Sequence, residues 1–344
     1  MSVAEKTPNS IVADPRWFAH RFDFRNDRYE FVFMPREMHR EIAFLDARSV
    51  PEHFERVVVP RQAAARAPRP RAPLHFIFHS GLCCSTLMAR ALDREGAVLG
   101  LKEPAILSDV VRYSLSGAGV EETRRTLDEA LSLLARPFQP GEALVAKTDS
   151  LSIRFAETML ELRGDSQALC LYAPLPVFLN SVVQKGLWGR LWGRKLLIGL
   201  LDASISGLGF SNQDYFAQTD LQAAACAWLS FHQYFARLVQ RFGSDRVRTI
   251  DSETFAGAPE NTLLALAAHF RLNLGPDQIR AIVEGPVFSR HAKTGEPYDL
   301  SRRASRIGEA DGANAEEIAY VAEWAAKVAE AHGFPFELGC RLIG

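Results

Sequence analysis

One short stretch, residues 75–90, restricts most strongly what this chain can fold into. Its apolar beginning, residues 75–78, ends at a turn of small residues that includes Gly81, and a helical pattern starts at Ser85 and Thr86. A buried strand, a tight loop and a helix N-terminus in this order are how α/β proteins hold phosphates, because free N–H groups and the helix dipole favour an anion. The loop has no Lys and does not match the G-x-x-x-x-G-K-S/T pattern, so its ligand is open at this point.

The composition is that of an ordinary soluble globular protein. Of 344 residues, 47% are hydrophobic and 24% are charged, and the formal net charge is -1. This balance predicts no broad nucleic-acid surface and no transmembrane segment. Five Cys without CxxC or zinc spacing, and no apolar leader in the first 15 residues, predict reduced thiols, no metal site and a cytoplasmic protein.

Changes in composition divide the chain into four parts. We expect residues 1–13 to be a disordered tail and residues 14–60 to be a small N-terminal segment containing a strand. Residues 61–73, rich in Ala, Arg and Pro, are typical of a linker, and residues 74–344 form the main domain. The N-terminal segment is either a layer on the main domain or a module that binds a partner.

After residue 74, strand and helix patterns alternate, which predicts an α/β fold of P-loop type. The sheet is mostly parallel, has about five strands and is flanked by helices on both faces, as a three-layer α/β/α arrangement. The expected strands cover residues 74–78, 98–101, 143–146, 168–172 and 246–250. Sites in such sheets lie at the carboxyl ends of the strands.

Charged residues follow two of these strands directly. Lys102 and Glu103 come after one strand, and Lys147 and Asp149 after another. Two ammonium groups and two carboxylates beside a phosphate loop suit group transfer from an anionic donor, since a Lys stabilises charge on the transferring group and a carboxylate accepts a proton. His79, at the end of the first strand, is either a base or a hydrogen-bonded structural residue.

Five local patterns, in order along the chain, resemble those of the sulfotransferases that depend on 3′-phosphoadenosine-5′-phosphosulfate (PAPS). Residues 81–87, GLCCSTL, resemble the P-K/R-S-G-T-T-L loop, and residues 102–104, KEP, resemble the E-P element. Residues 147–149, KTD, are similar to the K-T-H element. Residues 249–263 resemble the Y-E-D-L…P-x-x-T-L signature, and residues 290–296, RHAKTGE, have the spacing of the R-K-G-x-x-G-D loop.

The resemblance covers residues 74–335 and implies transfer of a sulfuryl group from PAPS to a hydroxyl or amine of a small-molecule or glycan acceptor, with no metal. It implies that Glu103 or Asp149 takes the acceptor's proton and that Lys102 or Lys147 neutralises developing charge. The residues implied to bind PAPS are Gly81, Leu82, Cys83, Cys84, Ser85, Thr86, Ser181, Arg290 and Lys293.

Two positions depart from the family pattern. Leu82 stands where the loop normally has Lys or Arg, and Ala173 stands where the fourth strand's element normally has Arg. Loss of two cations weakens an anion site unless other cations replace them. The candidates for replacement are Lys102, Lys147, Arg290, Lys293, Arg190, Arg194 and Lys195.

Other interpretations stay open at this point. The Ser85–Thr86 pair could simply cap a helix, Asp149 could cap the helix after it, and the two Cys could be small loop residues or reactive thiols. The chain could also be a non-catalytic binding protein with a sulfotransferase fold, or a kinase-like nucleotide-binding enzyme. Residues 187–212, a long insertion, are expected to set acceptor specificity.

Overall fold

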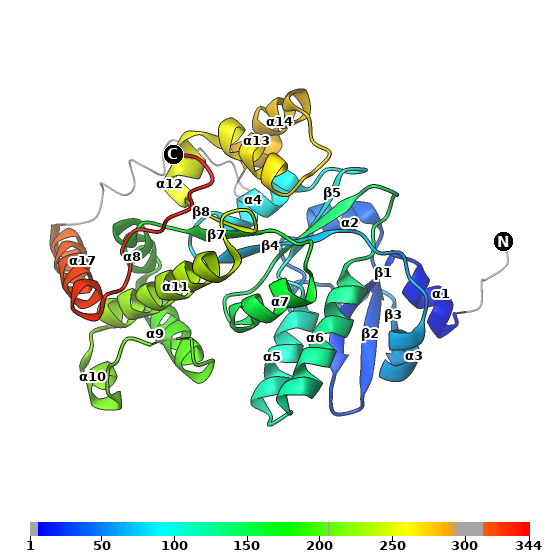
Figure 1. Cartoon of the computed structure of the whole chain (residues 1–344), viewed down its shortest axis with the longest axis horizontal. Helices are drawn as coiled ribbons and strands as arrows, with labels where there is room; N and C mark the ends of the chain where they lie inside the picture. The colour runs from blue at the N-terminus through cyan, green and yellow to red at the C-terminus, as the bar shows by residue number, and fades with distance from the viewer. Residues whose placement is uncertain (1–5, 206, 291, 293–311) are drawn as a thin grey trace.

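The centre of the protein is a parallel β-sheet, seen in Figure 1 of the computed structural model, which describes residues 6–205, 207–290, 292 and 312–344. Its five strands run in the order β5-β6-β4-β7-β8. They are β4 (Leu74–His79), β5 (Val98–Lys102), β6 (Ala143–Lys147), β7 (Ala168–Tyr172) and β8 (Val247–Asp251). The five-stranded parallel sheet confirms the predicted fold class.

The apolar runs of the sequence form this sheet because both of its faces are covered. All six residues of β4 are buried between β6 and β7. The parallel register pairs Lys102 with Lys147 and Tyr172 with Asp251, so the carboxyl ends of neighbouring strands lie at one edge of the sheet. The residues that follow the strands are therefore brought together, as the strand order predicts.

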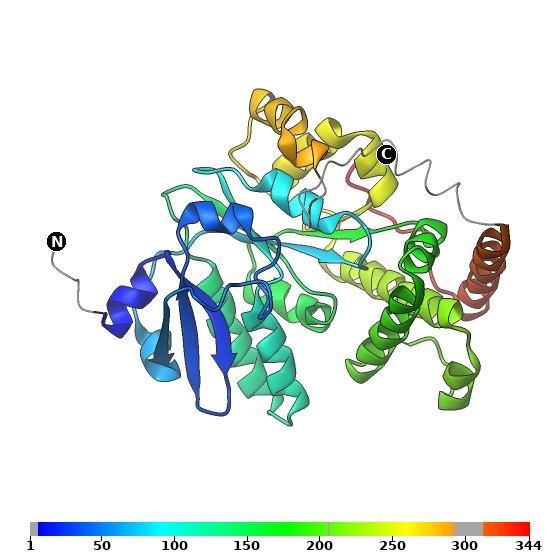
Figure 2. The ribbon, with the colours of Figure 1, turned by 180° about the vertical axis from the view of Figure 1, so that it is seen from behind.

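Helices form a layer on each side of the sheet. In Figures 1 and 2, helix α4 (Ser85–Leu92) and the group α12 to α15 lie above the sheet, and α5, α6, α7 and α11 lie below it. The lower helices are α5 (Ala105–Leu115), α6 (Val120–Leu134), α7 (Ala156–Leu162), preceded by the 3₁₀ turn η1 (Ser152–Phe155), and α11 (Asp220–Phe242). The upper group is α12 (Ser252–Gly257), α13 (Pro259–His269), α14 (Pro276–Val283) and α15 (Pro286–Ser289). The remaining helices in the described residues of the main part are α8 (Leu175–Val183), α9 (Gly186–Asp202), α10 (Asn212–Ala217) and α17 (Gly312–His332).

The N-terminal segment is a second, smaller layer on the same core. Strands β1 (Trp17–Asp23), β2 (Arg28–Phe33) and β3 (Arg56–Pro60) form an antiparallel sheet, and β1 packs against α5 and α6 (Figure 2). Helices α1 (Pro8–Ala13), α2 (Arg36–Glu41) and α3 (Arg61–Arg66) belong to this layer. We call these residues, 8–66, the N-terminal layer; its buried side chains join those of the main sheet in one hydrophobic core.

Two parts of the expected division differ from the structure. Residues 8–13, expected in a disordered tail, form α1, because Ile11 and Val12 find apolar surface and are 1% and 0% exposed. Residues 61–66, expected in a linker, form α3, whose Arg61 is buried. The apolar contacts and charge partners that order both segments lie far away in the sequence, which explains why local composition missed them.

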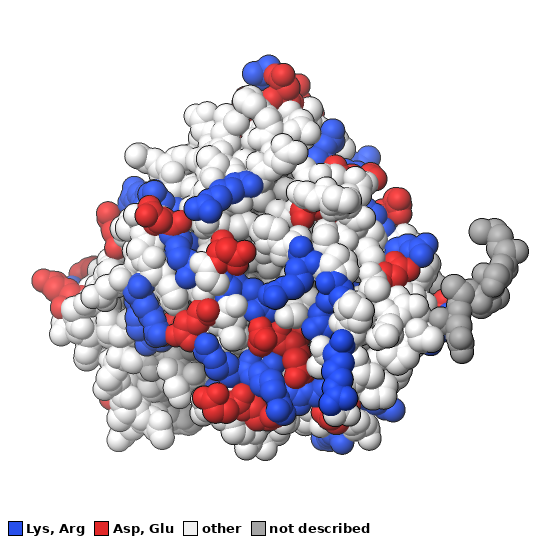
Figure 3. All heavy atoms as spheres, turned by 45° about the vertical axis from the view of Figure 1, so that its right-hand side comes forward, with Lys and Arg blue, Asp and Glu red and all other residues white. Residues whose placement is uncertain are grey.

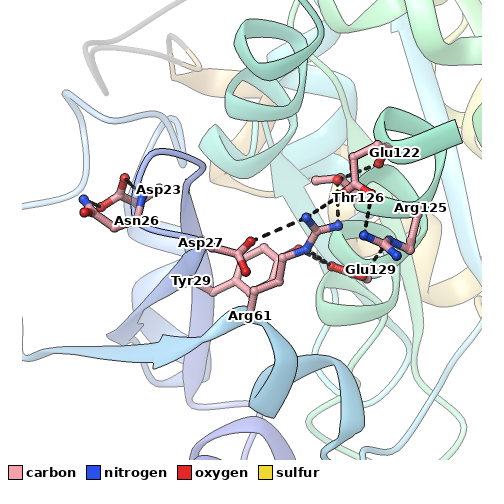
Figure 4. Close-up of polar contacts among 9 residues, drawn as sticks. All are labelled: Asp23, Asn26, Asp27, Tyr29, Arg61, Glu122, Arg125, Thr126 and Glu129. Atoms are coloured by element: carbon pink, nitrogen blue, oxygen red, sulfur yellow. Dashed lines mark hydrogen bonds and ion pairs between the residues drawn. The ribbon is translucent and has the colours of Figure 1, made fainter. Parts of the chain in front are cut away.

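Arg61 anchors the N-terminal layer to α6 (Figure 4). Its guanidinium donates to Glu129 at 2.6 Å, to Glu122 at 2.6 Å and to the Thr126 hydroxyl at 2.8 Å. The Tyr29 hydroxyl of β2 donates to the same Glu129 at 2.9 Å. Burial lowers the pKa of Arg61, but the hydrogen bonds to both carboxylates outweigh burial and raise that pKa overall, which keeps the guanidinium charged.

A second arginine, Arg136, ties the start of the chain to the end of α6. Its side chain donates to the carbonyl oxygens of Val12 at 3.0 Å and Trp17 at 2.6 Å. Burial lowers the pKa of Arg136 to about 9. Buried cations are stable only when their donors are satisfied, so α1 and β1 are held in place by carbonyls that this one side chain requires.

Within the described residues, no helix has the length and apolarity to cross a bilayer.

Replacing Arg61 with Met should lower the free energy of unfolding by about 2–4 kcal/mol, because Glu122 and Glu129 then lose a buried partner. Arg125→Met is the matched control, since Arg125 contacts the same carboxylates but its side chain is 66% exposed, and it should cost less than about 1 kcal/mol. Urea denaturation of both variants measures the difference. Equal losses would show that Arg61 is no more important than a surface ion pair.

Candidate functional site

The loop between β4 and α4 has the backbone shape of an anion site. Gly81, Leu82 and Cys84 have positive φ values of 82°, 52° and 62°. Left-handed residues in such turns direct consecutive N–H groups into one concavity, and the loop ends at the N-terminus of α4. The first turn of α4 contains no acidic residue, and its N-cap residue, Cys84, makes no side-chain capping hydrogen bond within the described chain. The loop therefore offers N–H donors and positive dipole to a ligand.

A cavity of about 530 Å³ opens over this loop. Its size is that of a pocket for a nucleotide-sized ligand. The loop, the ends of β5 and β6, helices α8 and α9, and the segment after α15 surround it. Its lining residues include Phe44, His79, Gly81, Leu82, Cys83, Cys84, Ser85, Thr86, Glu103, Lys147, Ser150, Ser181, Lys185, Trp188, Trp192, Arg290 and Ala292.

Thr86 has an unsatisfied polar atom at this cavity. The residue is 3% exposed, and its Oγ1 has no hydrogen-bond partner within the described part of the chain. A buried hydroxyl without a partner costs free energy, and at the wall of a cavity a bound ligand can supply the missing hydrogen bond. Together with the loop shape, this atom favours ligand binding over the simple helix cap that the Ser85–Thr86 pair could also have formed.

His79 holds the loop in shape. Its Nδ1 accepts the N–H of Gly81 at 3.0 Å, and its Nε2 lies 2.8 Å from the carbonyl oxygen of Thr148. The carbonyl requires N–H at Nε2, and the amide requires a lone pair at Nδ1, which describes a neutral imidazole. Of the two roles considered for His79, the hydrogen bonds fit the structural one.

Glu103 and Lys147 form an ion pair at the mouth of the cavity. The Lys147 side chain is 1% exposed, that of Glu103 is 23% exposed, and the ammonium donates to the carboxylate. The same ammonium lies 5.2 Å from the centre of the Phe44 ring. Glu103 has a φ of 55°, an unfavourable value for a residue with a side chain. Strain of this kind concentrates at functional sites, where the rest of the structure imposes a side chain's direction.

Lys102 is not part of this cavity, although the register places it beside Lys147. Its ammonium is buried and donates to the carbonyl oxygen of His39 in α2. Burial lowers the pKa of Lys102 to about 8 and holds the pKa of His39 well below its usual value. The two ammonium groups therefore have different environments: one faces the cavity and one supports the N-terminal layer.

Asp149 is engaged as a helix cap. Its Oδ1 accepts the N–H groups of Leu151 at 2.9 Å and Ser152 at 3.1 Å, and its Oδ2 accepts the hydroxyl of Ser108 at 3.0 Å. The residue lines a smaller neighbouring cavity rather than the one over the loop. These hydrogen bonds fit the capping interpretation of Asp149.

Among the described residues, three cationic side chains line the cavity over the loop: Lys147, Lys185 and Arg290. Arg190 and Arg194 do not line it, because they pair with Glu317 at 2.9 Å and with Asp220, respectively. Lys293 lies outside the described residues.

The structure also explains one of the two missing cations. Ala173 is 0% exposed, and its carbonyl oxygen accepts the Nε1–H of Trp228 at 2.8 Å. An arginine would not fit at this position without displacing the core. Leu82, in contrast, lines the cavity, so at this position an apolar side chain stands where the family pattern has a cation.

Sequence reasoning missed several lining residues, and Lys185 and Phe44 are two of them. Lys185 lies in the turn between α8, which ends at Val183, and α9, which begins at Gly186, so no helical spacing links it to Ser181. Phe44 lies in an irregular segment after α2. It reaches the cavity because its neighbour Leu45 is hydrogen-bonded to the end of β5. The Leu45 N–H donates to the Lys102 carbonyl at 2.6 Å, and the Leu45 carbonyl accepts the Ala105 N–H at 3.0 Å. No local pattern reveals a contact of this kind.

The close packing of Trp192 on the loop makes Gly81 hard to replace. An ideal Cβ at Gly81 would lie 3.0 Å from Cη2 of Trp192, and its φ of 82° disfavours a side chain. Gly81→Ala should therefore destabilise the loop by about 1 kcal/mol or more and weaken ligand binding at the cavity. Gly257→Ala is the control, because nothing lies within 4 Å of its Cβ position. Thermal unfolding measures the melting temperatures of the Gly81→Ala and Gly257→Ala variants. Equal melting temperatures would contradict the strain expected at Gly81.

No protein-family model and no curated protein matches the chain. Several solved structures match the chain in fold. The sulfotransferase domain of the curacin biosynthetic pathway is 15% identical with a TM-score of 0.45, covering 79% of this chain and 100% of that domain. The sulfotransferase domain of a Synechococcus olefin synthase is 14% identical with a TM-score of 0.40, covering 78% of this chain and 98% of that domain. A Mycobacterium avium sulfotransferase is 13% identical with a TM-score of 0.43, covering 78% of this chain and 78% of that protein. The chain is similar to these domains in fold alone, so its reaction must be inferred from its own cavity.

Proposed function

We propose that this protein is a sulfotransferase that moves a sulfuryl group from PAPS to a hydroxyl or amine of an acceptor. The observation that carries the proposal is one cavity that combines a left-handed loop at a helix N-terminus, the unpartnered Thr86 hydroxyl and the Glu103–Lys147 pair. Anion-binding and proton-accepting groups are thus within one pocket, as group transfer from an anionic donor requires.

The donor fits the residues over the loop. Backbone N–H groups of residues 81–86 and the Thr86 hydroxyl would bind the 5′-phosphosulfate. Ser181 and Arg290 would bind the 3′-phosphate, with Lys293 assigned by the motif alone. Lys185 is the added cation on this side, and it lies 5.7 Å from the centre of the Trp188 ring. PAPS, when bound, supplies a sulfuryl group attached to a good leaving phosphate.

Glu103 is the base in this proposal. Its carboxylate takes the proton of the acceptor hydroxyl or amine while that oxygen or nitrogen bonds to sulfur. The bond between sulfur and the bridging phosphate oxygen breaks, and the electron pair leaves with 3′-phosphoadenosine-5′-phosphate (PAP). Lys147 stabilises the charge that develops at the reacting centre. Lys102 and Asp149 are left out of this group, because the first binds a carbonyl of α2 and the second caps a helix.

One observation favours a binding protein without activity as the second candidate. Leu82 replaces the cation that the resemblance places next to the transferred group, and Lys147 is already paired with Glu103. Binding of PAP without turnover of any acceptor would support this alternative. Tighter binding of ATP with Mg²⁺ than of PAP would support the kinase-like alternative instead.

PAP should bind at micromolar to low millimolar concentration in isothermal titration. Thr86→Val, which removes the hydroxyl but keeps the shape, should raise the dissociation constant about 10- to 100-fold, the value of one hydrogen bond to a charged group. Its stability should be unchanged or higher, because an unsatisfied buried oxygen is removed. Thr262→Val is a matched control: its Oγ1 is also buried without a partner in the described chain, away from the cavity. Absence of PAP binding at millimolar concentration would refute the proposed function.

Glu103→Gln should lower kcat by about 10²–10⁴-fold, because the amide cannot accept the proton, and should leave PAP binding intact. Asp149→Asn keeps an oxygen that accepts the capping hydrogen bonds, and it should retain most of the activity. Single-turnover release of PAP measures both. A larger loss in Asp149→Asn than in Glu103→Gln would reassign the base.

A further inference from the structure

The proposed reaction uses the backbone of Cys84 but gives no role to its thiol. Cys84 lines the cavity over the loop and is the N-cap residue of α4, a helix of eight residues with no acidic residue in its first turn. A helix N-terminus stabilises negative charge, and the thiolate is the reactive form of cysteine. This position therefore favours the reactive thiol over the small loop residue, the two roles that the sequence allowed.

Positive side chains outnumber negative ones at this cavity. Among the described residues, its lining contains Lys147, Lys185 and Arg290 but a single carboxylate, that of Glu103. On the surface drawn in Figure 3, by contrast, basic and acidic side chains lie close together, so their charges partly cancel. The cavity therefore attracts anions, and it stabilises a thiolate more than such a surface does.

A second group at the same cavity requires a ligand. Thr86 is 3% exposed, and its Oγ1 has no hydrogen-bond partner within the described residues. Because Cys84 and Thr86 both line the cavity, a molecule that reaches the thiol can also accept a hydrogen bond from this hydroxyl. Carboxylate oxygens accept such bonds more strongly than neutral groups do.

The other cysteines have different surroundings. Cys170 and Cys226 are buried, and burial raises the pKa of both thiols, that of Cys226 to about 12. Cys83 is 1% exposed, and its thiol donates to a carbonyl oxygen of β7 at 3.5 Å. Cys340 is half-buried like Cys84 but does not line the cavity. Cys340 is therefore an internal reference for a thiol of similar exposure outside the cavity.

A disulfide between Cys83 and Cys84 is not the expected product of oxidation. The Cα atoms of neighbouring residues lie about 3.8 Å apart, whereas disulfides usually span about 4.4–6.8 Å between Cα atoms. The Cys84 thiol is therefore expected to react with a molecule that enters from solvent. The cavity of about 530 Å³ has room for a small disulfide.

We propose that Cys84 is a modification site at which a small disulfide that carries carboxylates, with the chemistry of oxidised glutathione, forms a mixed disulfide inside the cavity. The Cys84 thiolate attacks one sulfur of that disulfide, so a new S–S bond forms and the original one breaks. The other half leaves as a thiolate with the electron pair; Cys84 is oxidised, the reagent is reduced, and the proton lost by Cys84 passes to solvent. The bound half then fills the space in which the donor is proposed to bind.

Reaction of the full, reduced chain with oxidised glutathione and with cystamine tests this proposal. Both are small disulfides, but near neutral pH the first is anionic and the second is cationic. Peptide mass spectrometry measures the rates of mixed-disulfide formation at Cys84 and Cys340. The rate with oxidised glutathione relative to that with cystamine should be at least about 10-fold higher at Cys84 than at Cys340. Equal ratios at the two cysteines, or no modification of Cys84, would overturn the proposal.

Lys185→Ala should lower this preference of Cys84 about 3-fold or more, because one cation of the cavity is removed. Lys195→Ala is the matched control, since Lys195 is an exposed lysine of α9 that does not line the cavity. It should leave the preference unchanged, as should Cys340→Ser. An equal fall in the two lysine variants would contradict selection of the reagent by the cavity.

PAP connects the modification to the proposed function. Saturating PAP should slow modification of Cys84 about 10-fold or more and leave that of Cys340 unchanged, since PAP and the bound half compete for one cavity. The modified protein should not bind PAP until dithiothreitol removes the group. Unchanged PAP affinity after modification of Cys84 would overturn the placement of the bound half in the cavity. If the protein binds no PAP at all, the proposed sulfotransferase activity fails, while the charge preference at Cys84 still tests the modification site.

Discussion

The site depends on direct hydrogen bonds between the carboxyl ends of β4, β5 and β6. The Glu103 N–H donates to the carbonyl oxygen of Lys147 at 2.7 Å, and the Thr148 N–H donates to that of Ile77 at 3.2 Å. The His79 ring then bridges from Thr148 to Gly81 in the loop between β4 and α4. Parallel pairing therefore places the loop between β4 and α4, the carboxylate of Glu103 and the ammonium of Lys147 at one edge. A shift of register by one residue would turn each side chain to the opposite face.

This arrangement stores backbone strain that the rest of the fold must support. Left-handed Leu82, Cys84 and Glu103 each cost about 1–3 kcal/mol relative to a relaxed backbone. The support comes partly from the N-terminal layer, which Arg61 and Arg136 join to α6 in one core. The segment of residues 14–60 is thus both a structural layer and a wall of the proposed site, in place of the separate module that its composition also allowed.

Much of the main domain was predictable because its signals are local. Strand β7 has the bounds expected from its apolar run, since all five of its residues are buried. Helix α9 was not predicted, because two arginines, one lysine and several glycines interrupt its apolar pattern. Its glycines serve packing: a Cβ at Gly193 would lie 2.9 Å from that of Ala224 in α11. Such a requirement is visible only when both helices are in place.

The two lysines that follow β5 and β6 separate what each level determines. The sequence by itself determined the alternating fold, the tight loop between β4 and α4, and the presence of a Lys and a carboxylate after each of these strands. Only the tertiary structure decided that Lys147 faces the cavity with Glu103, while Lys102 donates to α2. The physical reason is that strand pairing determines the face of the sheet from which a side chain projects, but the element packed over that face determines the side chain's hydrogen-bond partner. For Lys102 that element is α2, about sixty residues earlier in the chain.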